Sequence, residues 1–229
     1  EVIDIVLEPL ASSLATLKEE EMKQGVVMID IGGGTTDIAF YKNNGLAYTS
    51  VVAIGGNHIT NDIAIGLRLP VDEAERVKMA YGTVLPDNGT DEEIGIMVAG
   101  RERKNIPRSY LYEIINPRCE ELLEIVKGEL EKCGAYEEAI YGVVLTGGAS
   151  QLKGLDRMAE AVLGLPVRIG FPENLSGLGD SVSDPKYSTG VGLLMYGAQN
   201  ETQPVITGDM FGGILTRMKN WVKGFLGKQ

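Results

Sequence analysis

The stretch that decides the fold is Asp30-Ile31-Gly32-Gly33-Gly34-Thr35-Thr36-Asp37. Residues 26–31 form a short apolar run, which predicts a buried strand that ends where the glycines begin. Three successive glycines let backbone N–H groups converge without obstruction by side chains, and such a concave row of amides binds anions such as phosphate. No Gly-Lys-Ser/Thr follows, so the stretch is not a P-loop.

The side chains around these glycines strengthen the prediction of a ligand site. Two threonines add hydroxyl donors, and two aspartates flank the turn. Magnesium prefers oxygen ligands and keeps several of its waters, which suits a pair of carboxylates. A glycine-rich turn without a ligand is the alternative, but two flanking carboxylates favour a site. We therefore predict phosphate contacts at Gly32, Gly33, Gly34, Thr35 and Thr36, and magnesium at Asp30 and Asp37.

A second glycine turn follows another apolar run. Residues 141–145 predict a buried strand that ends in Thr146-Gly147-Gly148-Ala149. Glycines at this position allow a flat ring such as adenine to lie against the backbone. Turns of this kind between a strand and a helix are common, so a purely structural turn remains an alternative. We predict nucleoside contacts at Gly147, Gly148 and Ala149.

A charged pair lies in the helix predicted for residues 71–81. Glu75 and Lys78 are three residues apart and therefore share a face of that helix. The pair suits contacts with a ribose and the edge of a base. A solvated ion pair on the helix surface is the alternative interpretation.

The whole chain reads as alternating helices and strands. We expect helices at 1–24, 59–67, 71–81, 109–134, 154–163 and 188–196, and strands at 26–31, 38–41, 46–54, 93–98, 141–145 and 167–169. Asn43-Asn44-Gly45 predicts a hairpin turn. Strands that alternate with helices indicate an α/β fold.

Composition limits the class of protein. The net charge of −11 over 229 residues argues against a general nucleic-acid binder. Cys119 and Cys133 lie in one predicted helix, about 21 Å apart at about 1.5 Å per residue, so we expect no disulfide between them. Free thiols are typical of a reducing cytoplasm. No run of 18 apolar residues predicts a membrane span, and we see no signal peptide.

The last residues have a different character from the acidic body. A polar, glycine-containing linker at 201–213 precedes a predicted amphipathic helix at 214–229. Arg217 and Lys219 flank its apolar stripe, which suits a helix lying on an anionic membrane surface. A terminal helix docked on the body is the alternative. The stripe consists of Ile214, Leu215, Met218, Trp221, Val222, Phe225 and Leu226.

The two glycine turns and the Glu75/Lys78 pair, in this order, resemble the superfamily of actin, sugar kinases and heat-shock chaperones. Finer features are similar to the bacterial cell-division FtsA family, from about residue 5 to the end. They are Leu10-Ala11-Ser12, Gly55-Gly56, Pro117-Arg118-Cys119 and Ser188-Thr189-Gly190.

The resemblance implies the second half of an actin-like (ribonuclease-H-like) ATPase fold with a small inserted α+β subdomain. Residues 1–24 would lead in from an absent first half. Residues 25–81 and 135–200 would form the nucleotide-facing subdomain IIA, and 82–134 the inserted subdomain IIB. ATP would then be held from one side only, so we assign no catalytic residue and expect at most a weak ATPase that needs the first half.

The resemblance also implies partners and a place in the cell. Such a protein would self-associate into actin-like filaments and tether FtsZ to the inner face of the cytoplasmic membrane at the division septum, in the Z ring. The acidic FtsZ tail peptide would dock on subdomain IIB, where Arg101, Arg108 and Arg118 supply charge. Alternatives are an MreB-type or PilM-type scaffold, or a sugar or acetate kinase of the same superfamily.

Overall fold

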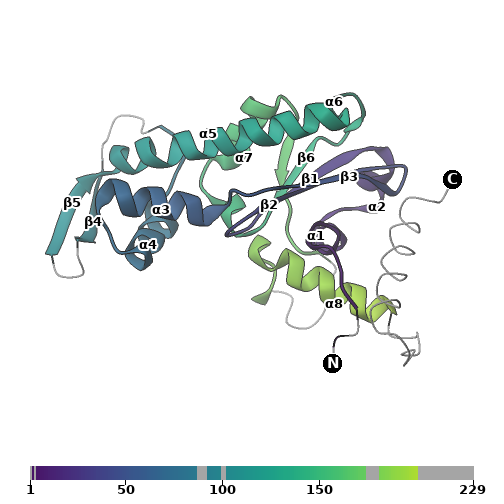
Figure 1. Cartoon of the computed structure of the whole chain (residues 1–229), viewed down its shortest axis with the longest axis horizontal. Coiled ribbons are helices and arrows are strands. Elements are labelled where there is room, and N and C mark those ends of the chain that lie inside the picture. The colour runs from purple at the N-terminus through teal and green to yellow at the C-terminus, as the bar shows by residue number, and fades with distance from the viewer. Residues whose placement is uncertain (1, 3, 87–91, 99–101, 174–180, 201–229) are drawn as a thin grey trace.

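The centre of the computed structural model is a five-stranded sheet with the strand order β3-β2-β1-β6-β7 (Figure 1). The structure describes the chain except for residues 1, 3, 87–91, 99–101, 174–180 and 201–229. The predicted linker and amphipathic helix therefore lie outside the described residues. The strands are β1 (Val26–Ile31), β2 (Thr36–Lys42), β3 (Gly45–Val52), β6 (Val143–Thr146) and β7 (Val167–Ile169).

The central strand β1 pairs antiparallel with β2 and parallel with β6. Asn43 and Asn44 join β2 to β3 with φ angles of 53° and 59°. Positive φ at both central residues is what a type I′ hairpin turn requires, so the predicted turn is confirmed. A mixed sheet with interleaved helices confirms the predicted α/β class.

Helices cover both faces of the sheet, with α5 and α7 on one side and α1 and α8 on the other (Figure 1). Val27 and Ile29 belong to one apolar core, whereas Val26 and Met28 belong to a second core with Leu10. Burial on both faces explains why β1 is apolar at nearly every position instead of alternating. These helices are α1 (Glu8–Thr16), α5 (Arg108–Cys133), α7 (Leu155–Leu163) and α8 (Ser188–Asn200).

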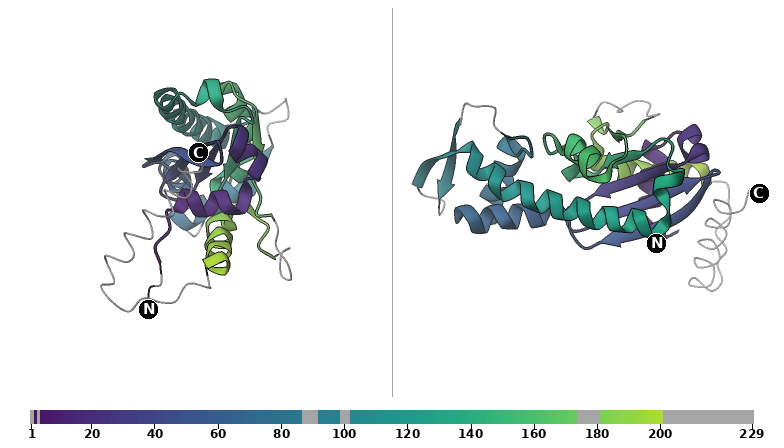
Figure 2. Two further views of the ribbon diagram at one scale, coloured as in Figure 1. Left: turned by 90° about the vertical axis from the view of Figure 1, so that its right-hand side faces the viewer. Right: turned by 90° about the horizontal axis from the view of Figure 1, so that it is seen from above.

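A second group of elements lies at the end of the molecule away from the sheet (Figures 1 and 2). It consists of α3 (Gly56–Leu67), α4 (Val71–Tyr81) and the antiparallel strands β4 (Glu93–Val98) and β5 (Glu102–Pro107). Helix α5 joins the two groups, because it contacts α3 and β5 and also β3 and α7. Its 26 residues span about 39 Å at about 1.5 Å per residue.

Two sequence predictions need correction. Residues 1–24 are not one helix: the chain is extended at Leu17 and Lys18, and a second helix, α2 (Glu19–Gln24), begins there. The Lys18 N–H donates to the Glu21 carboxylate at 2.8 Å, which caps α2 and separates it from α1. Strand β5 was not predicted, since its residues are mostly polar; its pairing with β4 makes it a strand. None of the described helices is long and apolar enough to cross a membrane.

Glu73 ties α4 to the edge of β4, and its charge is expected to matter for stability. It accepts hydrogen bonds from Arg76 and, at 2.8 Å, from the Met97 N–H. The Arg76 guanidinium, chiefly, lowers the pKa of Glu73 to about 2. A lowered pKa means that the ionised form stabilises the fold above the usual carboxyl range, and that this contribution is lost as the pH falls toward 2.

We therefore expect Glu73→Gln to lower the free energy of unfolding at pH 7 by roughly 0.5–1 kcal/mol, because the pair is close to solvent. The difference from the wild type should shrink steadily between pH 4.5 and pH 2. Urea denaturation at several pH values measures it, with Glu113→Gln on the exposed face of α5 as the control. An equal loss at every pH would show that the charge of Glu73 is not responsible.

Candidate nucleotide-binding cleft

One cleft of about 710 Å³ lies between the sheet and the α3–α4 group. It is lined by the turn after β1, the start of α3, one face of α4 and the turn after β6. The carboxyl ends of the parallel strands β1 and β6 meet at the same edge of the sheet, which brings both glycine turns together. Among the predicted residues, Gly32, Gly33, Glu75, Lys78, Gly148 and Ala149 line the cleft.

The first glycine turn is fastened to the start of α3. The Gly32 carbonyl accepts from the Gly56 N–H at 2.9 Å, and the Gly33 carbonyl accepts from the Asn57 N–H at 2.8 Å. A Cβ on Gly55 would lie 2.7 Å from both carbonyl oxygens, so this close approach requires glycine. The turn is thus held as a rigid wall of the cleft.

The Glu75–Lys78 pair is built into the cleft wall. The Lys78 Nζ lies 2.7 Å from Glu75 Oε2, 2.8 Å from Thr60 Oγ1 and 3.0 Å from the Gly56 carbonyl, and its side chain is 12% exposed. Burial opposes ionisation of Glu75, but hydrogen bonds from Lys78 and Thr60 outweigh it and lower its pKa. The alternative of a solvated surface pair therefore does not describe Lys78.

The two candidate metal ligands lie side by side on the neighbouring strands β1 and β2. Asp30 and Asp37 are register partners, and they are 4% and 6% exposed. Burial raises the pKa of both carboxyls, although hydrogen bonds from Ser12 to Asp30 and from Thr35 to Asp37 act in the opposite direction. Burial, with the charges of these two aspartates, also raises the pKa of Glu8.

This pair of carboxylates suits a hard cation that offsets the cost of burying their charges. Asp30 and Asp37 would supply oxygen to magnesium, which neutralises phosphate charge when bound. In the part of the chain that the structure describes, no three His, Cys, Asp or Glu side chains gather to hold a metal by themselves. Water and phosphate oxygens would therefore have to complete the coordination.

Four predicted nucleotide contacts do not line the cleft: Gly34, Thr35, Thr36 and Gly147. The two candidate metal ligands, Asp30 and Asp37, do not line it either and are buried at its edge, next to the glycine turns. The prediction for Thr36 needs correction, because its side chain is fully buried and its hydroxyl donates to the Ile54 carbonyl at 2.8 Å. Gly147 has a φ of +85°, and a Cβ there would lie 2.2 Å from Asp30 Oδ1. Its contribution is close packing of the turn on Asp30.

Several cleft residues were not predicted, because no local pattern marks them. Asn57, Met79, Gln151, Lys153, Asp184 and Lys186 also line the cleft. Asp184 and Lys186 belong to the short turn before α8, where the Lys186 N–H donates to Asp184 Oδ1 at 3.0 Å. Their approach to the second glycine turn, where Gln151 Nε2 donates to Asp184 Oδ1 at 2.7 Å, depends on the tertiary fold alone.

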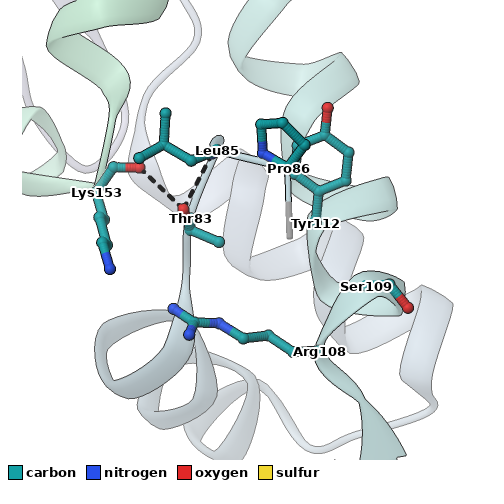
Figure 3. A pocket seen from close by; sticks show the side chains of 7 residues that line it. All are labelled: Thr83, Leu85, Pro86, Arg108, Ser109, Tyr112 and Lys153. Atoms are coloured by element: carbon teal, nitrogen blue, oxygen red, sulfur yellow. Dashed lines mark hydrogen bonds between the residues drawn. The ribbon is translucent and has the colours of Figure 1, made fainter. Parts of the chain in front are cut away.

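A second pocket of about 200 Å³ adjoins the cleft and shares Arg108 and Lys153 with it (Figure 3). The Thr83 hydroxyl donates to the Lys153 carbonyl at 3.2 Å and accepts from the Leu85 N–H at 3.0 Å. The Arg108 Nε is buried without a hydrogen-bond partner among the described residues.

Two of the three arginines that were predicted to bind a partner, Arg108 and Arg118, are described, and they have different surroundings. Arg101 lies outside the described residues. Arg108 lines the cleft and the second pocket, whereas Arg118 grips Asp62 of α3 with distances of 2.6 and 3.1 Å and also contacts Glu121. Asp62, above all, raises the pKa of the Arg118 guanidinium.

A family model described as "Cell division protein FtsA" matches residues 27–192. The chain belongs to the FtsA family. The FtsA of Pseudomonas aeruginosa is 42% identical to it over 98% of this chain and 56% of the relative. The FtsA of Neisseria meningitidis serogroup B is also 42% identical, and that of Escherichia coli K12 is 38% identical. The chain thus spans about half the length of the curated relatives that it matches.

Solved structures show that this FtsA-family chain has the actin-like fold. MreB5 of Spiroplasma citri bound to ADP superposes with a TM-score of 0.67 at 20% identity, over 87% of this chain and 61% of that chain. MreB5 bound to AMPPNP gives 0.69 at 19% identity, over 96% and 62%. The PilM–PilN type IV pilus biogenesis complex gives 0.64 at 20% identity, over 88% and 54%.

Proposed function

We propose that the chain is the half of an actin-like cell-division protein that holds ATP and magnesium from one side. The observation that carries this proposal is that Gly32 and Gly33, the Glu75–Lys78 pair and Gly148–Ala149 all line the same cleft. The first turn would face the phosphates, the pair the ribose, and the second turn the base. Related folds crystallised with ADP or AMPPNP support it.

Titration of a fluorescent ADP analogue, followed by anisotropy with excess magnesium, tests the proposal. We expect saturable binding that Lys78→Met weakens roughly tenfold or more, because a hydrogen-bonding cation is removed from the cleft wall. Lys23→Met, on the exposed surface of α2, is the control and should bind like the wild type. A folded wild-type chain that shows no saturable binding would remove the support for a nucleotide site.

We further propose that the chain helps to tether FtsZ filaments through their acidic tail peptide, which would dock on subdomain IIB. The boundary predicted at residue 82 moves to residue 56 in this proposal, because α3 and α4 lie with β4 and β5 and not with the sheet. Subdomain IIB would then be 56–134, and 25–55 with 135–200 would be subdomain IIA. Anisotropy of a labelled FtsZ tail peptide is the measurement. Saturable binding that is lost in Arg101→Glu with Arg118→Glu supports the dock. Binding that survives both substitutions would exclude these arginines, and no binding would exclude the dock on this chain.

Membrane attachment and self-association belong to the same proposal. The amphipathic pattern of 214–229 supports peripheral binding to the anionic inner face of the cytoplasmic membrane. Co-sedimentation should occur with vesicles that contain phosphatidylglycerol, and Trp221→Glu should abolish it. Equal binding to purely zwitterionic vesicles would contradict the electrostatic part. Filaments should appear in light scattering only when nucleotide is present.

A further inference from the structure

Two hydroxyl groups from helices outside the cleft hold Asp30. The Ser12 hydroxyl, on α1, donates to Asp30 Oδ2 at 2.5 Å. Thr189 Oγ1, at the start of α8, lies 2.9 Å from Ser12 Oγ and 3.3 Å from Asp30 Oδ2. Ser12 is completely buried and Asp30 is 4% exposed, so this contact is a built part of the interior.

The number of hydrogens limits the hydrogen bonds that these two hydroxyls can donate. A hydroxyl carries one hydrogen, and that of Ser12 is directed to Asp30. The Thr189 hydroxyl also carries one hydrogen, and two acceptors lie within its reach: Asp30 Oδ2 at 3.3 Å and Ser12 Oγ at 2.9 Å. With either acceptor the two hydroxyls converge on Asp30 Oδ2: Ser12 binds it directly, and Thr189 binds it directly or through the Ser12 oxygen.

The two hydroxyls contact only one oxygen of the Asp30 carboxylate, Oδ2. Among the described residues no hydrogen bond reaches Asp30 Oδ1. This oxygen lies under the second glycine turn, where a Cβ on Gly147 would be 2.2 Å away. The next residue, Gly148, lines the cleft. The hydrogen bonds from α1 and α8 hold Oδ2, and they therefore fix the direction in which the other oxygen, Oδ1, points.

We propose that Ser12 and Thr189 are positioning residues that orient the Asp30 carboxylate toward the magnesium ion bound with the nucleotide. The inference rests on the proposed nucleotide site and names residues of that site that lie outside the cleft. Outer hydrogen-bond partners of metal ligands typically change metal affinity by about 10- to 100-fold when they are removed. It also makes the α1–α8 helix pair part of the metal site, since one hydroxyl comes from each helix.

The ratio of two dissociation constants tests this inference. The dissociation constant of a fluorescent ADP analogue is measured with excess magnesium and again with EDTA. The value in EDTA divided by the value in magnesium is the factor by which the metal strengthens binding. We expect Ser12→Ala to reduce this ratio roughly tenfold. Thr189→Val keeps the shape of the side chain but removes its hydroxyl, whose contact with Asp30 is longer than that of Ser12. It should therefore reduce the ratio by a smaller factor, and Thr189→Ser, which keeps a hydroxyl, should bind like the wild type.

Ser13→Ala is the matched control, because Ser13 is also buried on α1 but its hydroxyl donates to the Pro9 carbonyl at 2.6 Å. A purely structural loss weakens binding equally with and without magnesium and leaves the ratio unchanged. An unchanged ratio in Thr189→Val and in folded Ser12→Ala would overturn the positioning role alone. A wild type that does not bind the analogue in either buffer would overturn the nucleotide site, and this inference with it.

Discussion

Replacing Gly147 with alanine is expected to lower the free energy of unfolding by about 2–6 kcal/mol. The backbone there has a φ of +85°, which strains any residue with a Cβ, and the new methyl would lie 2.2 Å from Asp30 Oδ1 and 2.6 Å from the Ile31 carbonyl. Gly147, Asp30 and Ile31 are all buried at this edge of the sheet, so they cannot shift easily to make room for the methyl group. A loss of this size is a large fraction of a typical total stability of roughly 5–15 kcal/mol.

Urea denaturation followed by circular dichroism measures the loss, and Gly148→Ala is the matched control. The methyl of that variant would meet only Lys186 Cβ, at an ordinary 3.6 Å. We therefore expect the control to stay within about 0.5 kcal/mol of the wild type. Two neighbouring glycines of one turn should thus differ by several kcal/mol, and equal stabilities would contradict the described packing of the turn on Asp30.

Replacing Gly192 with alanine is expected to force α1 and α8 apart. A Cβ on Gly192 would lie 1.7 Å from the Ala11 carbonyl oxygen, which is backbone and cannot swing away. Overpacking of this kind costs about 1–3 kcal/mol, and occasionally more. Because Ser12 is the next residue of α1 and Thr189 lies one turn away on α8, the same variant should also disturb the contacts of both hydroxyls with Asp30.

Gly197→Ala, further along α8, provides a control with the opposite sign. Nothing lies within 4 Å of a Cβ at that position. Alanine within a helix is more stable than glycine by roughly 0.5–1 kcal/mol. The free energy of unfolding should therefore fall in Gly192→Ala and rise in Gly197→Ala. Stabilisation by both substitutions would show that the helices do not cross as closely as described.

Much of the cleft was predictable from sequence because its signals are local. An apolar run followed by glycines marks the end of a buried strand, and two such strands in parallel bring their turns to one edge. The actin-like fold followed from the order of these signals. The break at Leu17 and Lys18 was not predictable from periodicity, since apolar residues continue at helical spacing through it.

The unpredicted parts of the site depend on contacts between distant residues. Ser12 lies 18 residues before Asp30 in the sequence, and Thr189 lies 159 residues after it. The sequence around Ser12 and around Thr189 contains no pattern that predicts a carboxylate partner for either hydroxyl. Thr36 illustrates the reverse case: its sequence position suggested a donor to phosphate, but its side chain is buried and its hydroxyl donates to the distant Ile54 carbonyl.

The continuous helix α5 has a consequence for how the molecule loses its structure. One apolar cluster includes Ile94 of β4, Leu111 and Leu130 from opposite halves of α5, and Leu163 of α7. The sheet has a second core with α1, but among the described residues the group of α3, α4, β4 and β5 has no interior apart from this shared cluster. Fraying of that group therefore exposes the apolar face of α5, on which the sheet also packs. Hydrogen exchange of the most protected amides in both groups should then report the same opening free energy, as one foldon.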